Sequence, residues 1–237
     1  MKIALCGYGK MGKIIEGIAL SRGHEITARF TRSNPLNTTE LSAADVVIEF
    51  TEPSAAVDNI SFCLHAGKPV VSGTTGWYAR LAELQELAVS QETALFTASN
   101  FSVGVNILFQ VNALLARLME GRSAYKLQME EIHHVHKKDA PSGTAITLAE
   151  GIMAANRDYS SWQETVSETE TGVIPIRSLR TDEVPGTHTI SWNSPEDRID
   201  LSHIAHNRHG FALGAVLASE FTFGRKGAFG MKDLLQF

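Results

Sequence analysis

The chain has 237 residues, of which 43% are hydrophobic and 20% charged, a balance that excludes disordered and fibrous proteins. Twenty-six acidic and twenty-one basic residues give a net charge of −5, so we expect no general attraction to nucleic acid or anionic lipid. No segment approaches the roughly 18 uninterrupted apolar residues of a membrane helix. At roughly 100–200 residues per domain, the length fits one large domain or two smaller ones.

The two cysteines, Cys6 and Cys63, are too few for a disulfide framework, and each lies in an apolar run. Both are therefore predicted to be buried, reduced thiols. The first apolar run, residues 3–6, is too short for a signal peptide. Together these features predict a cytoplasmic protein that has neither nucleic acid nor a membrane as its partner.

The first hundred residues alternate between short apolar runs and helical spacing. Strands are expected at Lys2–Cys6, Glu25–Phe30, Asp45–Phe50, Pro69–Ser72 and Ala94–Thr97. Helices are expected around Met11–Ile18, from Pro53 to Leu64 and over Leu81–Ala88, where apolar residues recur at helical spacing. Repeated alternation of this kind predicts a parallel sheet with helices on both faces.

The pattern changes after Asn100. One long helix is expected over Val103–Met119, with apolar side chains along one side at Ile107, Leu108, Val111, Leu114, Leu115 and Leu118. Strands are expected at Ala124–Ile132, Val173–Leu179, Thr187–Trp192 and Arg198–Ala205, with one helix at about Ser142–Ala155. Strands clustered in this way predict a second α+β domain on an open mixed or antiparallel sheet.

The predicted domain boundaries follow from this change of pattern. Residues 1–102 and about 208–237, the latter with a helix at Phe211–Phe221, form the first domain, and about 103–207 form the second. The polar segment Asp158–Gly172 is expected to be a solvated loop.

A glycine-rich turn follows the first predicted strand. Gly7-Tyr8-Gly9-Lys10-Met11-Gly12 matches G-x-G-x-x-G at the start of the first helix. The first glycine permits a tight turn, the second lets a pyrophosphate approach the backbone, and the third lets helix and strand pack closely. The helix N-terminus offers N–H groups to the phosphates. In this setting the motif predicts a Rossmann-type dinucleotide site, with an incidental glycine-rich turn as the alternative.

The end of the second predicted strand bears on the choice of dinucleotide. An acid there would accept a hydrogen bond from the ribose 2′-hydroxyl of NAD, whereas an arginine would hold the 2′-phosphate of NADP. The segment Arg29–Asn34 has two arginines, Arg29 and Arg32, and no acid. This favours NADP; surface solvation is the alternative role for the arginines.

The segment Glu131–Ala145 is the most unusual part of the sequence. It places His133, His134, His136 and two lysines close together, after a predicted strand and before a predicted helix. Histidine exchanges protons near neutral pH, and lysine supplies a compact positive charge. The following Pro-Ser-Gly-Thr is a helix start whose N–H groups would attract an anion. These features suit a small acidic substrate that carries carboxylates.

Two other interpretations of this segment stay open. A metal site would need a cysteine or acid at zinc-ligand spacing, and the neighbouring ammonium groups oppose a cation. A solvated loop is the default for any charged run. A second cluster, formed by His203, His206 and His209 near Arg208, has either a structural or a functional role.

The chain resembles the dihydrodipicolinate reductases, also called 4-hydroxy-tetrahydrodipicolinate reductases, of bacterial lysine and diaminopimelate synthesis. Its residues Glu131–Ala145 meet the family signature E-x-H-H-x-x-K-x-D-x-P-S-G-T-A in full. Other matching segments are Glu49–Thr51, Gly73–Gly76, Ala98–Gly104, His203–Ala205 with Arg208, Phe211 and Gly214, and Gly230–Asp233. The chain is short for the family between the second and third strands, and its glycine turn lacks one family glycine.

The resemblance implies that His133 is the acid/base group and that Lys137 is a second proton donor that also holds a substrate carboxylate. It implies that the substrate, a small cyclic imine with two carboxylates, is bound by His134, Ser142, Gly143 and Thr144. The dinucleotide would be bound by Gly7, Tyr8, Gly9, Lys10, Met11, Gly12, Gly73, Thr74, Thr75, Ala98, Ser99, Asn100 and Phe101, with no metal. A homotetramer built on the sheet of the second domain is also implied.

Cofactor choice follows from the same comparison. Thr31 stands where many family members carry an acid, and Arg32 stands where they carry an arginine. We therefore expect NADPH to be preferred and NADH to be the weaker alternative.

Two alternative functions would share the glycine turn: another NADP-dependent reductase on the same plan, such as an amino-acid dehydrogenase, and a non-catalytic dinucleotide sensor. Neither would need the proton donor, lysine and anion pocket together.

Overall fold

Six parallel strands form one sheet, in the order β11-β5-β4-β3-β1-β2. They are β1 (Lys2–Cys6), β2 (Glu25–Phe30), β3 (Val46–Glu49), β4 (Val70–Ser72), β5 (Ala94–Thr97) and β11 (Gly227–Phe229). Every residue of β3 and β4 is buried, as strands covered on both faces should be. The predicted Rossmann-type parallel sheet is confirmed.

The computed structural model describes residues 1–165, 167 and 170–237. These residues divide into unit 1, Met1–Val103 with Arg208–Phe237, and unit 2, Gly104–Asn207. The six-stranded sheet belongs to unit 1. Across the described part of the chain, every helix is too short or too polar to span a bilayer.

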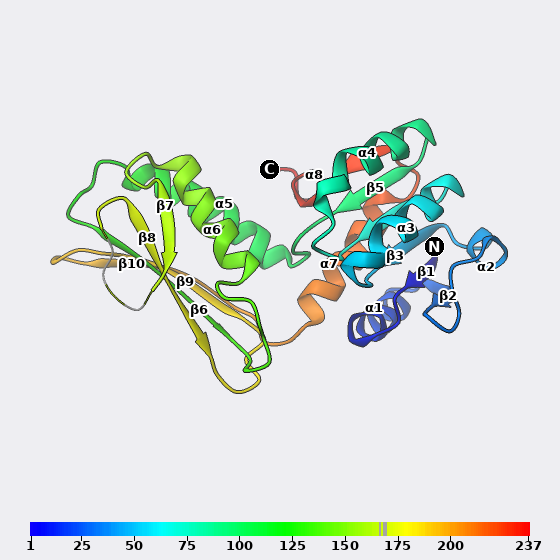
Figure 1. Cartoon of the computed structure of the whole chain (residues 1–237), viewed down its shortest axis with the longest axis horizontal. Coiled ribbons are helices and arrows are strands. Elements are labelled where there is room, and N and C mark those ends of the chain that lie inside the picture. Colours follow the sequence, from blue (N-terminus) through cyan, green and yellow to red (C-terminus); the bar gives the residue numbers. More distant parts are fainter. Residues whose placement is uncertain (166, 168–169) are drawn as a thin grey trace. The chain divides into compact units, whose positions relative to one another are not determined.

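Helices cover both faces of the unit 1 sheet (Figure 1). They are α1 (Lys10–Ser21), α2 (Thr38–Ser42), α3 (Pro53–His65), the 3₁₀ turn η1 (Tyr78–Arg80), α4 (Leu81–Ser90), α7 (His209–Thr222) and α8 (Met231–Leu235). One core joins α3 and α4 to the sheet through Ile60 and Leu84, and the opposite core joins α1 and α7 through Ile15 and Val216. The carboxyl edge of the parallel strands is thereby held between two packed layers.

Both cysteines lie in unit 1 and are free and buried, as predicted. Burial, with a smaller contribution from the Glu49 carboxylate, raises the pKa of the Cys63 thiol to about 12. Both thiols are therefore inert side chains of the core at neutral pH.

Unit 2 is built on a five-stranded sheet in the order β10-β9-β6-β8-β7. Its strands are β6 (Lys126–His133), β7 (Ser161–Glu164), β8 (Val173–Arg180), β9 (Thr187–Asn193) and β10 (Arg198–Ile204). The pairs β6–β9 and β9–β10 are antiparallel, whereas β6–β8 and β7–β8 are parallel. The predicted α+β fold on a mixed sheet is confirmed.

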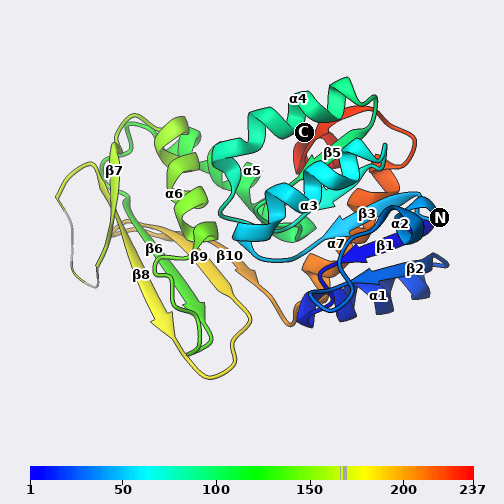
Figure 2. The same ribbon diagram turned by 45° about the vertical axis from the view of Figure 1, so that its right-hand side comes forward.

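Two helices, α5 (Val103–Met119) and α6 (Gly143–Ala155), pack on one face of the unit 2 sheet (Figure 2). Their side chains Leu108 and Leu148 share a core with the strand residues Met129, Ile190 and Trp192. Along β6 the buried positions alternate and end in Glu131 and His133. The helix-covered face thus changes from apolar to ionisable side chains at the carboxyl end of β6.

The predicted apolar side of the Val103–Met119 helix is partly wrong. Leu108 is buried, but Ile107, Val111, Leu114 and Leu118 are between 41% and 58% exposed. The buried seam instead includes Asn112, whose Nδ2 donates to the Leu148 carbonyl of α6 at 3.0 Å. A polar side chain with a bonding partner therefore replaces an apolar one in the interface, which hydrophobic periodicity does not reveal.

Two further differences concern unit 2. The segment Asp158–Gly172, expected to be a loop, contains β7, which pairs in parallel with β8; residues 166 and 168–169 lie outside the described residues. Strand β6 continues to His133, which was expected to follow the strand. Its carbonyl accepts from the Thr181 N–H at 2.8 Å, so cross-strand pairing carries the strand further than its apolar pattern. In unit 1, the short strand β11 was not predicted either, because three residues give no periodicity.

Candidate active site

The glycine turn of unit 1 has the geometry that its sequence predicts. Gly7 has φ +94°, and a Cβ on it would lie 2.0 Å from the Phe50 carbonyl oxygen. A Cβ on Gly12 would lie 2.3 Å from the Gly7 carbonyl oxygen, whereas a Cβ on Gly9 would meet nothing within 4 Å. Gly9 also caps the N-terminus of α1. Gly7 and Gly12 are thus packed closely against neighbouring backbone, whereas Gly9 leaves its backbone open where a pyrophosphate would approach.

A buried carboxylate orders the loops beside this turn. Glu49 ends β3 with 1% of its surface exposed, and it accepts from Ser72 Oγ at 2.6 Å and Thr74 Oγ1 at 2.8 Å. The N–H and hydroxyl of Thr51 donate to it as well. The loops after β3 and β4 are therefore joined by one hydrogen-bonded network.

The remaining residues predicted to bind the dinucleotide follow the same strand edge. Gly73, Thr74 and Thr75 follow β4, and Ala98–Phe101 follow β5. Because parallel strands share a carboxyl edge, these loops and the glycine turn lie along one side of the sheet, where α/β folds bind ligands. The side chain of Phe101 itself is buried among Phe96 and other core residues.

Each arginine at the end of β2 has an acidic partner. Arg32 Nη2 donates to both carboxylate oxygens of Glu52, at 2.9 and 2.8 Å, while the Arg32 side chain remains 87% exposed. Arg29 instead pairs with Glu16 of α1, which also accepts from Tyr8 Oη. Arg32 is therefore the more accessible of the two for a 2′-phosphate.

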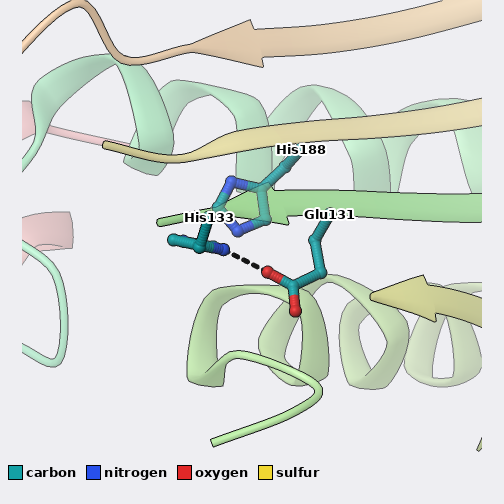
Figure 3. Close-up of side chains that lie close together, drawn as sticks. All are labelled: Glu131, His133 and His188. Carbon is teal, nitrogen blue, oxygen red and sulfur yellow. Dashed lines mark hydrogen bonds and ion pairs between the residues drawn. The ribbon is translucent and has the colours of Figure 1, made fainter. Parts of the chain in front are cut away.

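In unit 2, Glu131 and His133 form a buried pair at the end of β6 (Figure 3). The two residues are 0% and 8% exposed. Burial opposes ionisation of the Glu131 carboxyl, but hydrogen bonds and charge interactions with His133 and Arg180 outweigh it and lower its pKa to about 2. An ionised carboxylate accepts only, so the proton in the pair resides on His133 Nδ1.

Arg180, the last residue of β8, faces the same carboxylate. Its Nη1 donates to Glu131 Oε1 at 2.9 Å, and its Nη2 donates to the Asp139 carbonyl at 2.5 Å. Its Nε donates to the Lys137 carbonyl at 3.4 Å. One guanidinium therefore neutralises Glu131 and also fixes the loop that carries Lys137.

His188 and Ser142 complete this arrangement, which we term the Glu131 cluster: Glu131, His133, Ser142, Arg180 and His188. A hydrogen bond of 3.1 Å joins His188 Nε2 to Ser142 Oγ, and the ring lies edge-on to His133 with centroids 5.1 Å apart. Burial, reinforced by the charge of His133, lowers the pKa of His188 to about 3. His188 is therefore neutral at physiological pH.

Ser142 also begins α6, as its sequence setting predicts. Its Oγ accepts from the Ala145 N–H at 3.2 Å, and the residue is 2% exposed. Gly143 and Thr144 form the first turn of the helix, and Gly143 is exposed. The positive end of the helix dipole therefore reaches the surface at Gly143, where it favours an anion.

The loop between β6 and α6 carries the other predicted site residues. Lys137 Nζ donates to both carboxylate oxygens of Asp139, at 2.8 and 2.7 Å, and its side chain is 21% exposed. His136 is exposed and lies 3.3 Å from Glu183, and the ring of His134 lies 6.2 Å from that of His136. His133 is thus held rigidly, whereas Lys137 and His136 have exposed carboxylate partners.

The cluster also offers atoms of the kind that bind metals. One ligand atom from each of Glu131, His133 and His188 lies within 4.8 Å of the others. The guanidinium of Arg180 is already paired with the Glu131 carboxylate, and it would repel a metal cation bound beside it. The contacts therefore favour an ion-pair network over a metal site.

Sequence reasoning gave no role to three members of the cluster: Glu131, which was noted only as part of the family signature, Arg180 and His188. Arg180 is 49 residues from Glu131, and His188 is 46 residues from Ser142. The alternation of His188 with Ile190 and Trp192 along β9 marks it as a buried-face residue, but nothing in the local sequence marks Arg180. The second histidine cluster is divided: His203 on β10 pairs in register with His188, while Arg208 and His209 belong to unit 1.

Two family models match the chain in sequence order. Dihydrodipicolinate reductase, N-terminus, matches residues 1–101, and dihydrodipicolinate reductase, C-terminus, matches residues 104–235. A 4-hydroxy-tetrahydrodipicolinate reductase from Christiangramia forsetii is 45% identical over 238 residues, which cover 99% of this chain and 98% of that protein. Another, from Ralstonia pickettii, is 30% identical over 264 residues and covers 99% of both.

Solved structures share the fold. A dipicolinate-bound dihydrodipicolinate reductase from a Paenisporosarcina species matches with a TM-score of 0.79 and 24% identity over 98% of both chains. An amine dehydrogenase from Mycobacterium smegmatis matches with a TM-score of 0.63 and 12% identity over 97% of this chain and 94% of that one. The fold alone does not separate these two activities. The family models and the 45% identical relative do, and the chain belongs to the dihydrodipicolinate reductase family.

Proposed function

We infer that this chain catalyses the NAD(P)H-dependent reduction of 4-hydroxy-tetrahydrodipicolinate to tetrahydrodipicolinate in lysine and diaminopimelate synthesis. The observation that carries this inference is the match to reductases over nearly the whole chain, at 45% identity in the Christiangramia relative. The complete histidine–lysine signature falls where the structure places an ionised cluster. The enzyme is an NAD(P)H-dependent oxidoreductase.

The glycine turn fits the dinucleotide because Gly9 leaves its backbone open while Gly7 and Gly12 close the turn against the protein. We propose that unit 1 binds the dinucleotide through this turn and the loops after β4 and β5. When bound, the reduced nicotinamide supplies a hydride to C4 of the unsaturated ring, from which water has left. The protein's own residues supply the charge and the proton.

His133 supplies that proton in our proposal. The Glu131 carboxylate holds its Nδ1, which leaves Nε2 to protonate the enamine that remains after hydride transfer. Lys137 supplies a second cation, which binds a substrate carboxylate. To do so, its ammonium group must leave its present partner, Asp139. The start of α6 at Gly143 and Thr144 receives the other carboxylate. His134, the first residue after β6, contributes a further contact to the substrate in this proposal.

We propose that NADPH is the preferred cofactor. The Arg32 side chain is 87% exposed, and a guanidinium suits a 2′-phosphate through its fork of donors. A charge-assisted contact is worth roughly ten- to a hundred-fold in affinity. Arg32→Ala should remove most of the preference and leave the Michaelis constant for NADH nearly unchanged. Equal use of both cofactors by the unmodified protein would contradict this assignment.

Assembly and location are also proposals. The face of the unit 2 sheet opposite α5 and α6 carries Gln128, Glu130, Thr189 and Ser191, which line part of a cavity of about 880 Å³. We propose that this face pairs with other copies in a homotetramer, and sedimentation analysis of the full chain tests it. A cytoplasmic location suits an enzyme whose two thiols are buried and reduced.

The activity has a direct test. The substrate is generated in place from fresh aspartate semialdehyde, pyruvate and the preceding synthase, and loss of NADPH absorbance is followed after this chain is added. A planar pyridine dicarboxylate should inhibit competitively against the substrate, because it presents two carboxylates to the same cations and N–H groups. No NADPH oxidation, or competition against the nucleotide instead, would overturn the proposed function.

A further inference from the structure

We propose that Glu131 is a positioning residue that acts through His133, by holding the imidazole in the form that carries its proton on Nδ1 and exchanges the second proton at Nε2. The proposal rests on the proposed function, since it concerns how the acid/base group of that reaction is held. It assigns a role to the carboxylate of Glu131, which is completely buried.

The contacts of Glu131 allow it to act only as an acceptor. Its Oε2 faces His133 Nδ1, and its Oε1 accepts from Arg180 Nη1 at 2.9 Å and from the Ser142 N–H at 3.3 Å. All three partners present N–H groups, and the carboxylate is completely buried. A protonated carboxyl would lose one of these bonds, so the cluster selects the carboxylate and, through it, the Nδ1–H imidazole.

Gly186 keeps the opposite edge of the ring clear. It immediately precedes β9 with φ +154°, and a Cβ there would lie 3.0 Å from His133 Nε2. The ring is 8% exposed, so a small displacement by a side chain would close that edge. Nδ1 is therefore anchored while Nε2 is kept accessible, which is the division that a proton donor needs.

The charged surroundings of His133 are asymmetric. Glu131 on β6 is hydrogen-bonded to a ring nitrogen of His133, whereas His188 on β9 meets the ring edge-on. Arg180 on β8 pairs with Glu131, and Lys137 on the following loop pairs with Asp139. Packed against the same carboxylate, α6 contributes Ser142, which has no charge. Glu131 is therefore the group through which the charge on the imidazole is stabilised.

This arrangement predicts a specific effect on the pH profile. A proton donor must be charged to act, so kcat falls as the pH rises and the imidazolium loses its proton. Glu131→Gln keeps the size of the side chain but removes the charge that favours the imidazolium. The high-pH limb of the kcat profile should therefore move to lower pH.

The experiment compares kcat, the NADPH Michaelis constant and the pH profile of full-length wild type and variants. Glu131→Gln should lower kcat roughly ten- to a hundred-fold, the worth of one hydrogen bond to a charged group, with an unchanged NADPH Michaelis constant. The kcat of Glu131→Asp should lie between that of Glu131→Gln and that of the wild type. Glu120→Gln is the matched control, because Glu120 also pairs with an arginine of unit 2: Arg157 Nε lies 2.6 Å from its Oε1, and the Arg157 side chain is 92% exposed. It should leave kcat and the profile unchanged.

A double variant separates positioning from general structural damage. If Glu131 acts through His133, adding Glu131→Gln to His133→Ala should lower kcat no further. A multiplied loss, or a wild-type kcat and profile in Glu131→Gln, overturns the proposal. If Glu131→Gln does not fold, Glu131→Asp decides, since an unchanged kcat there also overturns it. Full turnover in His133→Ala would instead refute the proposed role of His133, so the two failures are distinct.

Discussion

Both units bury a glutamate carboxylate near the carboxyl end of a strand, and the two are held in different ways. Glu49 in unit 1 accepts from hydroxyl and N–H groups of Thr51, Ser72 and Thr74. Glu131 in unit 2 accepts from a guanidinium and an imidazole. The two residues are 1% and 0% exposed, so burial does not distinguish them.

The difference lies in what the donors can do. Hydroxyl and backbone donors keep their protons at any ordinary pH, so the Glu49 network can only fix the loops around it. An imidazole exchanges its proton near neutral pH, so the Glu131 cluster can take part in chemistry. The comparison teaches that the chemistry of a buried carboxylate is set by its donors, a conclusion that variants of His133 and Glu49 test directly.

The largest effect is expected from removing the titrating donor. His133→Ala should lower kcat by roughly 10²–10⁴-fold, the usual contribution of a general acid–base group. The Michaelis constant for NADPH should barely change, because the glycine turn belongs to unit 1. Steady-state kinetics with both substrates varied provides the measurement. Turnover near that of the wild type would show that His133 is not the proton donor.

Glu49→Gln tests the structural carboxylate. The amide places an NH₂ group against hydroxyl donors such as Ser72 and Thr74, so the free energy of unfolding should fall by about 1–3 kcal/mol. Binding of NADPH should weaken because the loops after β3 and β4 lose their common acceptor. The pH profile of kcat should keep its shape, in contrast to Glu131→Gln. Urea denaturation and fluorescence titration with NADPH check this, and an altered profile would remove the distinction between the two carboxylates.

His188, which lies in unit 2, should make the free energy of unfolding depend on pH. Its pKa is lowered from 6.5 to about 3 on folding, so between these values the unfolded state binds a proton that the folded state does not. Stability therefore falls as the pH falls through this range, by about 2 kcal/mol from pH 6.5 to 5. His188→Gln should abolish that part of the decline, while His65→Gln, at an exposed histidine of α3, should leave it. Urea denaturation at pH 6.5 and pH 5 measures the decline in the free energy of unfolding. An equal decline in His188→Gln and wild type would contradict this prediction.

The smallest effect is expected at the exposed pair of unit 1. If Arg32 binds the 2′-phosphate as we propose, Glu52 competes with that phosphate for it, and both side chains are exposed, at 49% and 87%. Such pairs are weak, so Glu52→Gln should tighten NADPH binding by only about two- to fivefold. NADH binding should not gain. A gain for both cofactors would mean that Glu52 repels the dinucleotide generally rather than occupying Arg32.

Local patterns were sufficient for most elements of the fold. Strand–helix alternation predicts unit 1, because parallel strands covered on both faces need continuous apolar runs such as Val46–Glu49. The glycine turn was predictable from its spacing, because Gly7 and Gly12 are the positions where the backbone packs closely and Gly9 is the position that is left open. The helix start at Ser142 was predictable because capping is decided within three residues.

Other features depended on packing between distant segments. Strand β7 exists because β8 pairs with it, and Asn112 is buried because α6 supplies a carbonyl. Neither partner is visible from the segment itself. Hydrophobic periodicity therefore placed the exposed residues of α5 on the same side as the buried ones.

The sequence by itself determined which residue types the site contains: the glycine turn, the histidine–lysine segment and the helix start at Ser142 are contiguous motifs with local physical causes. Only the tertiary structure decided how they are held. Sheet pairing brings Arg180 opposite His133 and His188 opposite Glu131, and it thereby places a guanidinium from β8 and an imidazole from β9 beside one carboxylate of β6. Hydrogen bonds reach only about 3 Å, so partners almost fifty residues apart become part of one site only when the strands pair.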